Sequence, residues 1–162
     1  MRARGFQMFA VSLVLGATTL AQVSWAADTK GGSKTGSGAP VFTAAGDLNW
    51  VDLDPKGAPG VKIADVWGDH AKGAFGAFLR FPAGFIAPLH THTHAIKIVV
   101  LSGTYLQTPD GKAEMRMGPG SYVLQPGGAY RHVSACDRAS DCELFIQSSG
   151  KFDLKLVGAP KQ

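Results

Sequence analysis

The chain has 162 residues, the length of one domain, and a formal net charge of only +4. Its lysines and arginines form no cluster, which argues against a nucleic-acid-binding surface. The sequence contains no amphipathic helical stretch of the kind that binds to a membrane surface.

The first 26 residues have the features of a secretory signal peptide. Arg2 and Arg4 give a positive start, residues 6–21 are mostly apolar, and Ser-Trp-Ala at residues 24–26 is a small-x-small cleavage pattern. An uncleaved membrane anchor is the alternative, but the apolar run is shorter than the ~20 residues that a spanning helix needs. We therefore expect cleavage after Ala26, no stable membrane insertion afterwards, and a periplasmic or secreted protein. Cleavage leaves 14 basic and 12 acidic residues, a formal charge of +2.

Residues 27–40 are rich in glycine and serine and almost free of apolar side chains, so they predict a flexible linker. In residues 41–162, short apolar or alternating runs are separated by Gly, Pro, Asp and Asn, and helical periodicity is missing. This pattern predicts one all-β domain, an antiparallel sandwich or barrel. The predicted strands are residues 48–53, 61–67, 74–81, 95–102, 104–108, 113–117, 121–125, 130–134, 143–148 and 152–157.

Three of the five histidines alternate with threonine in one short stretch, at His90, His92 and His94. In an extended strand every second side chain lies on the same face, so the three imidazoles share one side. Neutral imidazole is the commonest protein ligand for transition metals. A fourth histidine, His132, follows the Pro-x-Gly turn of residues 126–128.

These two segments resemble the paired motifs of the cupin superfamily. The first begins at Gly84 and reaches His-x-His after five residues; the second begins at Gly120 and reaches Pro-x-Gly after five, followed by a histidine. The resemblance covers residues 75–152 and implies a cupin-like β-barrel, the double-stranded β-helix or jelly roll. It also implies one divalent transition metal ion: zinc, iron, copper, manganese or nickel. The ligands that we expect in the first place are His90, His92 and His132.

The sequence departs from the family pattern where cupins commonly have a glutamate ligand. Counted from His92, that position falls on Ile96 or Lys97, and residues 70–109 contain no Asp or Glu. Three possibilities stay open: His94 takes the vacant position, water takes it, or no tight metal site exists. Because an ammonium group would repel a divalent cation, we expect Lys97 to face outward.

Strand alternation nominates side chains that line a pocket beside these histidines. On the strand of His132, Ser134 shares its face. On the last long strand, residues 143–148, alternation places Phe145 and Gln147 toward the pocket. If the alternation is shifted by one residue, Leu144 and Ile146 face the pocket instead. For the aromatic residues the alternative is plain core filling, because small barrels fill their interiors with side chains. The predicted pocket residues are Tyr105, Gln107, Tyr130, Phe145 and Gln147.

Cys136 and Cys142 flank a polar, turn-like segment. In an oxidising compartment such a pair commonly forms a disulfide, which closes a short loop and contributes about 2 to 3 kcal/mol. The alternative is Cys136 as a metal ligand, four residues after His132.

Three functions are compatible with these observations. The first is an exported metal-binding cupin that holds a small anionic or hydroxylated ligand at one metal ion, with turnover left open. The second is a metal-dependent oxidoreductase of the dioxygenase kind, and the third is a non-catalytic module that senses metal or assembles with partners. The resemblance also allows a homodimer formed through sheet edges.

Overall fold

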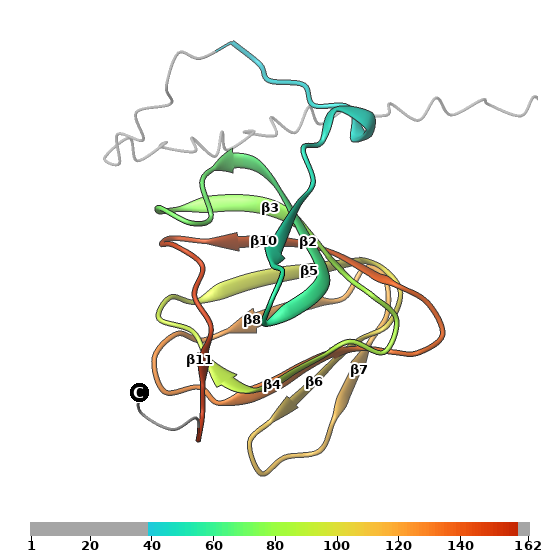
Figure 1. Cartoon of the computed structure of the whole chain (residues 1–162), viewed down its shortest axis with the longest axis vertical. Helices are drawn as coiled ribbons and strands as arrows, with labels where there is room; N and C mark the ends of the chain where they lie inside the picture. Colours follow the sequence, from blue (N-terminus) through green and yellow to red (C-terminus); the bar gives the residue numbers. More distant parts are fainter. Residues whose placement is uncertain (1–38, 159–162) are drawn as a thin grey trace, which may run out of the picture. The chain divides into compact units, whose positions relative to one another are not determined.

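The computed structural model describes residues 39–158, which form two antiparallel sheets stacked face to face (Figure 1). A short 3₁₀ helix, η1 (Ala45–Asp47), precedes the strands. In spatial order the six-stranded sheet consists of β1 (Val51–Asp54), β2 (Ala58–Gly68), β3 (Phe75–Phe81), β10 (Cys142–Ser148), β5 (Ile96–Ser102) and β8 (Tyr122–Gln125). The five-stranded sheet consists of β11 (Lys155–Leu156), β4 (Ile86–Thr91), β9 (His132–Cys136), β6 (Tyr105–Pro109) and β7 (Met115–Met117).

This architecture confirms the predicted all-β jelly roll. Across the described residues the two sheets are not hydrogen-bonded into one closed barrel, so the molecule is a sandwich of the jelly-roll kind. The predicted leader, most of the linker up to residue 38 and residues 159–162 lie outside the described residues. No helix in residues 39–158 has the length and apolar character needed to cross a membrane.

The core lies between the two sheets and follows from strand alternation. On β5, Ile96, Ile98 and Val100 are buried, whereas Lys97 and Val99 between them face outward. Burying an aliphatic side chain fully contributes roughly 1.5 to 3 kcal/mol, so each inward row stabilises its strand in one register. The outward position of Lys97 is the one expected from the sequence.

All ten predicted strands overlap strands of the structure, and β4 is the strand that the apolar patterns do not predict. Its sequence contains a proline and two polar residues, so it lacks an uninterrupted apolar alternation. β4 pairs with β9 and brings together residues more than forty positions apart, including the partners His90 and His132. The jelly-roll crossover thereby unites the two histidine segments.

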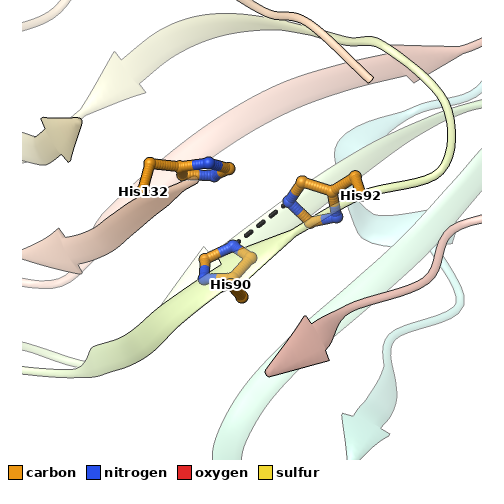
Figure 2. A group of neighbouring side chains, drawn as sticks. All are labelled: His90, His92 and His132. Carbon is orange, nitrogen blue, oxygen red and sulfur yellow. Dashed lines mark hydrogen bonds between the residues drawn. The ribbon is translucent and has the colours of Figure 1, made fainter. Parts of the chain in front are cut away.

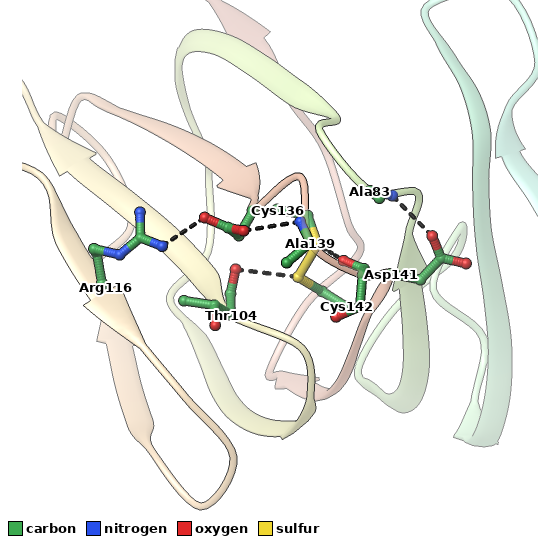
Figure 3. Close-up of a disulfide and its surroundings, with 9 residues drawn as sticks. Ala83, Thr104, Arg116, Cys136, Ala139, Asp141 and Cys142 are labelled. Atoms are coloured by element: carbon green, nitrogen blue, oxygen red, sulfur yellow. Dashed lines mark hydrogen bonds and ion pairs between the residues drawn. A yellow bond between two sulfur atoms is a disulfide. The ribbon is translucent and has the colours of Figure 1, made fainter.

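A disulfide joins the two sheets (Figure 3). The Sγ atoms of Cys136, at the end of β9, and Cys142, at the start of β10, are 2.01 Å apart. Beside it, the main-chain N–H of Ala83 donates a hydrogen bond to Asp141 Oδ1 at 2.8 Å. The predicted pairing is confirmed, and a bonded sulfur at Cys136 excludes the alternative of a thiolate metal ligand.

Candidate metal site

Three histidines meet on the inner face of the five-stranded sheet (Figure 2). His90 lies on β4, His92 directly follows that strand, and His132 begins β9. Their side chains are almost completely buried. The ring centroids of His90 and His132 are 4.3 Å apart, and those of His90 and His92 are 4.8 Å apart. One ligand nitrogen from each of the three lies within 4.8 Å of the others.

The second cupin-like motif fixes the end of the first through a close main-chain contact. The N–H of Gly128 donates a hydrogen bond to the carbonyl of His92 at 2.8 Å. A Cβ atom at Gly127 would lie 2.5 Å from the carbonyl oxygen of Thr93, which is closer than real Cβ atoms come. Glycine is therefore required where the turn after β8 meets the histidine segment.

Main-chain carbonyls set the tautomer of all three rings. His90 Nδ1 lies 2.6 Å from the carbonyl oxygen of Pro88, and His132 Nδ1 lies 3.3 Å from that of Tyr130. His92 Nδ1 bonds in the same way to the carbonyl oxygen of Asp153. A carbonyl only accepts hydrogen bonds, so each Nδ1 carries the hydrogen. In a neutral imidazole the lone pair is then on Nε2.

The three Nε2 atoms consequently face one another without hydrogens. His90 Nε2 and His92 Nε2 are 3.2 Å apart, and His132 Nε2 is buried without a partner. Burial lowers the pKa of His90 and of His132 from 6.5 to about 4, and it lowers the pKa of His92 as well. All three rings are therefore neutral at pH 7, and their converging lone pairs match the needs of a transition metal ion.

His94 lies outside this group. The chain leaves the extended conformation after Thr91, so the alternation that would place His94 beside His90 ends there. Its ring instead lies against Gly150, where an added Cβ would be 2.3 Å from the ring. Within residues 39–158 no carboxylate belongs to the group either. Of the three possibilities left open for the position of the missing glutamate, this geometry does not support the one in which His94 takes it.

A cavity of about 50 Å³ adjoins His90 and His92 between the two sheets. Its wall is almost entirely aliphatic and aromatic, with polar atoms from three further residues. These residues are Tyr105, Gln125 and Ser134.

Of the five predicted pocket residues, Tyr105 lines this cavity and four do not. Gln107 is buried and donates a hydrogen bond to the Tyr130 hydroxyl at 3.1 Å, while the Tyr130 ring stacks on that of His132 with centroids 4.9 Å apart. Gln107 therefore holds the Tyr130 hydroxyl, and the Tyr130 ring packs on His132.

Phe145 and Gln147 point to the outer face of the six-stranded sheet, and the alternative pair faces the cavity. On the outer face Phe145 packs edge-to-face against Phe78, with ring centroids 5.6 Å apart. This outer aromatic contact explains why the sequence does not show which face of β10 points inward: the strand carries large apolar side chains on both faces. The inward pair is Leu144 and Ile146.

Residues 151–156, called the C-terminal strap below, are the part of the site that the sequence does not predict. Lys155 and Leu156 of the strap pair with Thr91 and His90 of β4. The Asp153 carboxylate accepts a hydrogen bond from the main-chain N–H of Thr93 at 2.7 Å and another from its hydroxyl. The strap thus holds both His92 and the residue after it.

A groove of about 530 Å³ lies on the other side of the cavity wall. Phe85, Phe152 and Leu154 line both spaces, so their side chains separate the cavity from the groove. Phe152 also contacts His92, with ring centroids 5.4 Å apart. The strap therefore contributes both to the candidate metal site and to the wall between the cavity and the groove.

A second group of possible ligands, Asp65, Asp69 and His70, is more exposed. Its polar atoms already have protein partners, because His70 Nδ1 bonds to Asp65 at 2.8 Å and Asp69 bonds to Lys72 at 2.7 Å. These contacts account for the group without an ion.

The family described as "Domain of unknown function (DUF4437)" matches residues 41–156. A comparison of the sequence with curated proteins finds no match. Among solved structures, the polyketide cyclase RemF from Streptomyces resistomycificus is similar with a TM-score of 0.63 and 16% identity, over 76% of this chain and 89% of that one.

Two further structures show the same similarity. An RmlC-like cupin from Shewanella frigidimarina NCIMB 400 has a TM-score of 0.54 and 18% identity, over 68% of this chain and 91% of that one. The DMSP lyase DddQ from Ruegeria pomeroyi DSS-3 has a TM-score of 0.58 and 17% identity, over 78% and 75% of the two chains. At such identities the likeness shows a shared fold, that of the RmlC-like cupins.

Proposed function

The chain belongs to the DUF4437 family, and from that premise and its cupin fold we propose that it is an exported metal-binding protein. One divalent transition metal ion binds to Nε2 of His90, His92 and His132 and holds a small ligand. The observation that carries this proposal is the set of three buried lone pairs: two Nε2 atoms 3.2 Å apart and a third without a partner.

The donor set selects the class of metal. Neutral imidazoles suit zinc, iron, copper, manganese and nickel, whereas magnesium and calcium prefer oxygen ligands. A bound ion of the first class supplies a Lewis acid with a position open for a ligand. The protein supplies three oriented nitrogens, an apolar wall that limits water, and hydroxyl groups from Tyr105 and Ser134.

Export is supported by the chemistry of the cysteines. The Cys136–Cys142 disulfide is of the kind that persists in an oxidising compartment, and the first 26 residues have the pattern of a signal peptide. Mass spectrometry of the protein from its host should find a chain that begins at Ala27. A chain that keeps its first 26 residues would contradict the proposed cleavage after Ala26 and favour the alternative of an uncleaved anchor.

Titration calorimetry of the metal-free protein with zinc tests the metal site. We expect saturation near one ion per chain, as in other mononuclear sites. His132→Ala should weaken zinc binding by about a hundredfold or more, because removing a residue that only hydrogen-bonds to a ligand already lowers metal affinity about 10- to 100-fold. His70→Ala is the matched control, since His70 lies outside the triad, and it should bind like the native chain. Equal affinities for the native chain and His132→Ala would contradict the proposed site.

A further inference from the structure

The charge of a bound ion has no counterpart in the wall of the cavity. Three neutral imidazoles leave the full dipositive charge on the metal, and none of the side chains that line the cavity, as far as residues 39–158 show, is charged. Burial raises the pKa of Tyr105, so its phenol keeps the proton. A buried charge without a partner is costly, so the counter-charge must come from the ligand.

Asp153, the acidic residue whose main-chain carbonyl bonds to His92, does not change this balance. The Asp153 carboxylate bonds to Thr93 and lies 3.6 Å from the Lys155 ammonium group. Its charge is therefore already matched by a cation on the same strap. The cavity itself is left with an unmatched positive charge when metal is bound.

A hydrogen-bond chain in the cavity wall leaves one hydrogen without an acceptor. Gln125 Nε2 donates to the Tyr105 hydroxyl at 2.9 Å, and the hydroxyls of Tyr105 and Ser134 are 2.8 Å apart. Only one of these two hydroxyls can donate within the pair. Whichever does so, the other hydroxyl hydrogen is left over, and within the described residues no further protein acceptor bonds to either group. Both residues are at most 5% exposed and line the cavity.

We propose that the cavity binds a small monocarboxylate with an apolar body. Its anionic group meets the charge of the metal ion, an oxygen atom accepts the spare hydrogen of the Tyr105–Ser134 pair, and its carbon atoms contact the aliphatic wall. A volume of about 50 Å³ admits only a few non-hydrogen atoms. This inference rests on the proposed metal site and names the class of ligand that the site takes.

Visible absorption of the cobalt(II)-loaded protein provides a test that needs no turnover. Propionate, propionamide and β-alanine have similar skeletons, but only propionate combines a negative charge with an apolar end. We expect propionate to change the cobalt spectrum in a saturable way, and the neutral amide and the zwitterion to bind at least about tenfold more weakly, because a buried charge needs a partner of opposite sign.

Two variants examine the hydroxyl pair separately. Ser134→Ala and Tyr105→Phe should each weaken propionate binding by about tenfold or more, as expected for a lost hydrogen bond to a charged group, at unchanged cobalt stoichiometry. The matched control is Ser148→Ala, which removes a buried hydroxyl on β10 that bonds to the N–H of Gly150. Propionate affinity should be unchanged in that control.

The failure of this inference differs from a failure of the metal site. If cobalt binds at one ion per chain but propionamide binds as tightly as propionate, or both hydroxyl variants keep the native affinity, the inference is wrong and the metal site stands. If the native protein binds no stoichiometric cobalt, the metal site and the inference fall together.

Discussion

At the scale of single residues, the site depends on where three hydrogens are. Each Nδ1 of the triad donates its hydrogen to a main-chain carbonyl, so each Nε2 presents a lone pair. Removing water from these rings favours their neutral form, as the lowered pKa values of His90 and His132 show. The folded chain therefore holds the triad in the protonation state that a metal requires.

The metal-free protein should lose stability as the pH falls from about 6.5 toward 4. In this range the unfolded chain binds protons at His90 and His132, whose pKa values are lowered to about 4 in the folded chain, so acid favours unfolding. The contribution is complete above pH 6.5 and is lost on acidification. At pH 5 the loss should reach up to about 2 kcal/mol for each histidine.

Urea unfolding of the metal-free protein at pH 7.5 and pH 5 measures this loss. Carboxyl groups with lowered pKa values, such as that of Asp137, release their stabilisation only below their ordinary pKa of 3.8, so they do not contribute between these two conditions. His90→Gln should lose less stability than the native chain over the same interval. An unfolding free energy that does not decrease between pH 7.5 and pH 5 would contradict this assignment.

At the scale of elements, the sequence predicts strands with one apolar face better than it predicts β4, the strand that carries His90. β5 alternates cleanly, whereas β4 interrupts its pattern with Pro88 and two polar side chains. The prediction that His90 and His132 contribute to the same site comes from the resemblance of two short motifs to the cupin pattern and not from periodicity. The inner face of β10 is ambiguous because Phe145 packs well on the outside.

The sequence predicts a strand at residues 152–157, but it gives no signal that the C-terminal strap contacts His92, and there is a physical reason for this. His92 bonds to the main-chain carbonyl of a residue 61 positions away, and any residue type offers a carbonyl. No pattern of side chains in the sequence can therefore predict this contact. The Asp153 carboxylate is the specific part, because it holds the Thr93 main chain.

Asp153→Ala should loosen the strap and weaken metal binding by about tenfold. This is the lower end of the loss of affinity that follows when a residue that orients a metal ligand is removed. The carbonyl that bonds to His92 is retained in this variant, so the effect arises from the lost anchoring of the strap to Thr93. Zinc titration measures the change, with the exposed strap residue Lys151→Ala as the control. If Asp153→Ala and Lys151→Ala bind zinc with the same affinity, the strap does not position His92.

At the scale of the whole molecule, the all-β fold class is predictable because short strands and turn residues alternate over most of the chain. The packing of two sheets in a jelly roll depends on contacts between residues far apart in the sequence, so local patterns do not predict it. The family resemblance does. One covalent contact joins the sheets directly, the bond between Cys136 and Cys142.

Replacing both cysteines by alanine should lower the free energy of unfolding by about 2 kcal/mol, since the disulfide closes a loop of only a few residues. Metal affinity should be unchanged, because Cys136 and His132 lie at opposite ends of β9. Chemical unfolding and zinc titration of the double variant give the two values. A large loss of zinc affinity would show that the disulfide, and not the strand pairing, holds the triad.

Elemental analysis tests the central claim most directly. The untagged protein is purified from its own host compartment without a metal-affinity column or chelator, beside His90→Ala as the ligand-deficient control. We predict about one transition metal ion per native chain and a small fraction of that in the variant. A native protein that is folded and contains no stoichiometric transition metal would contradict the account.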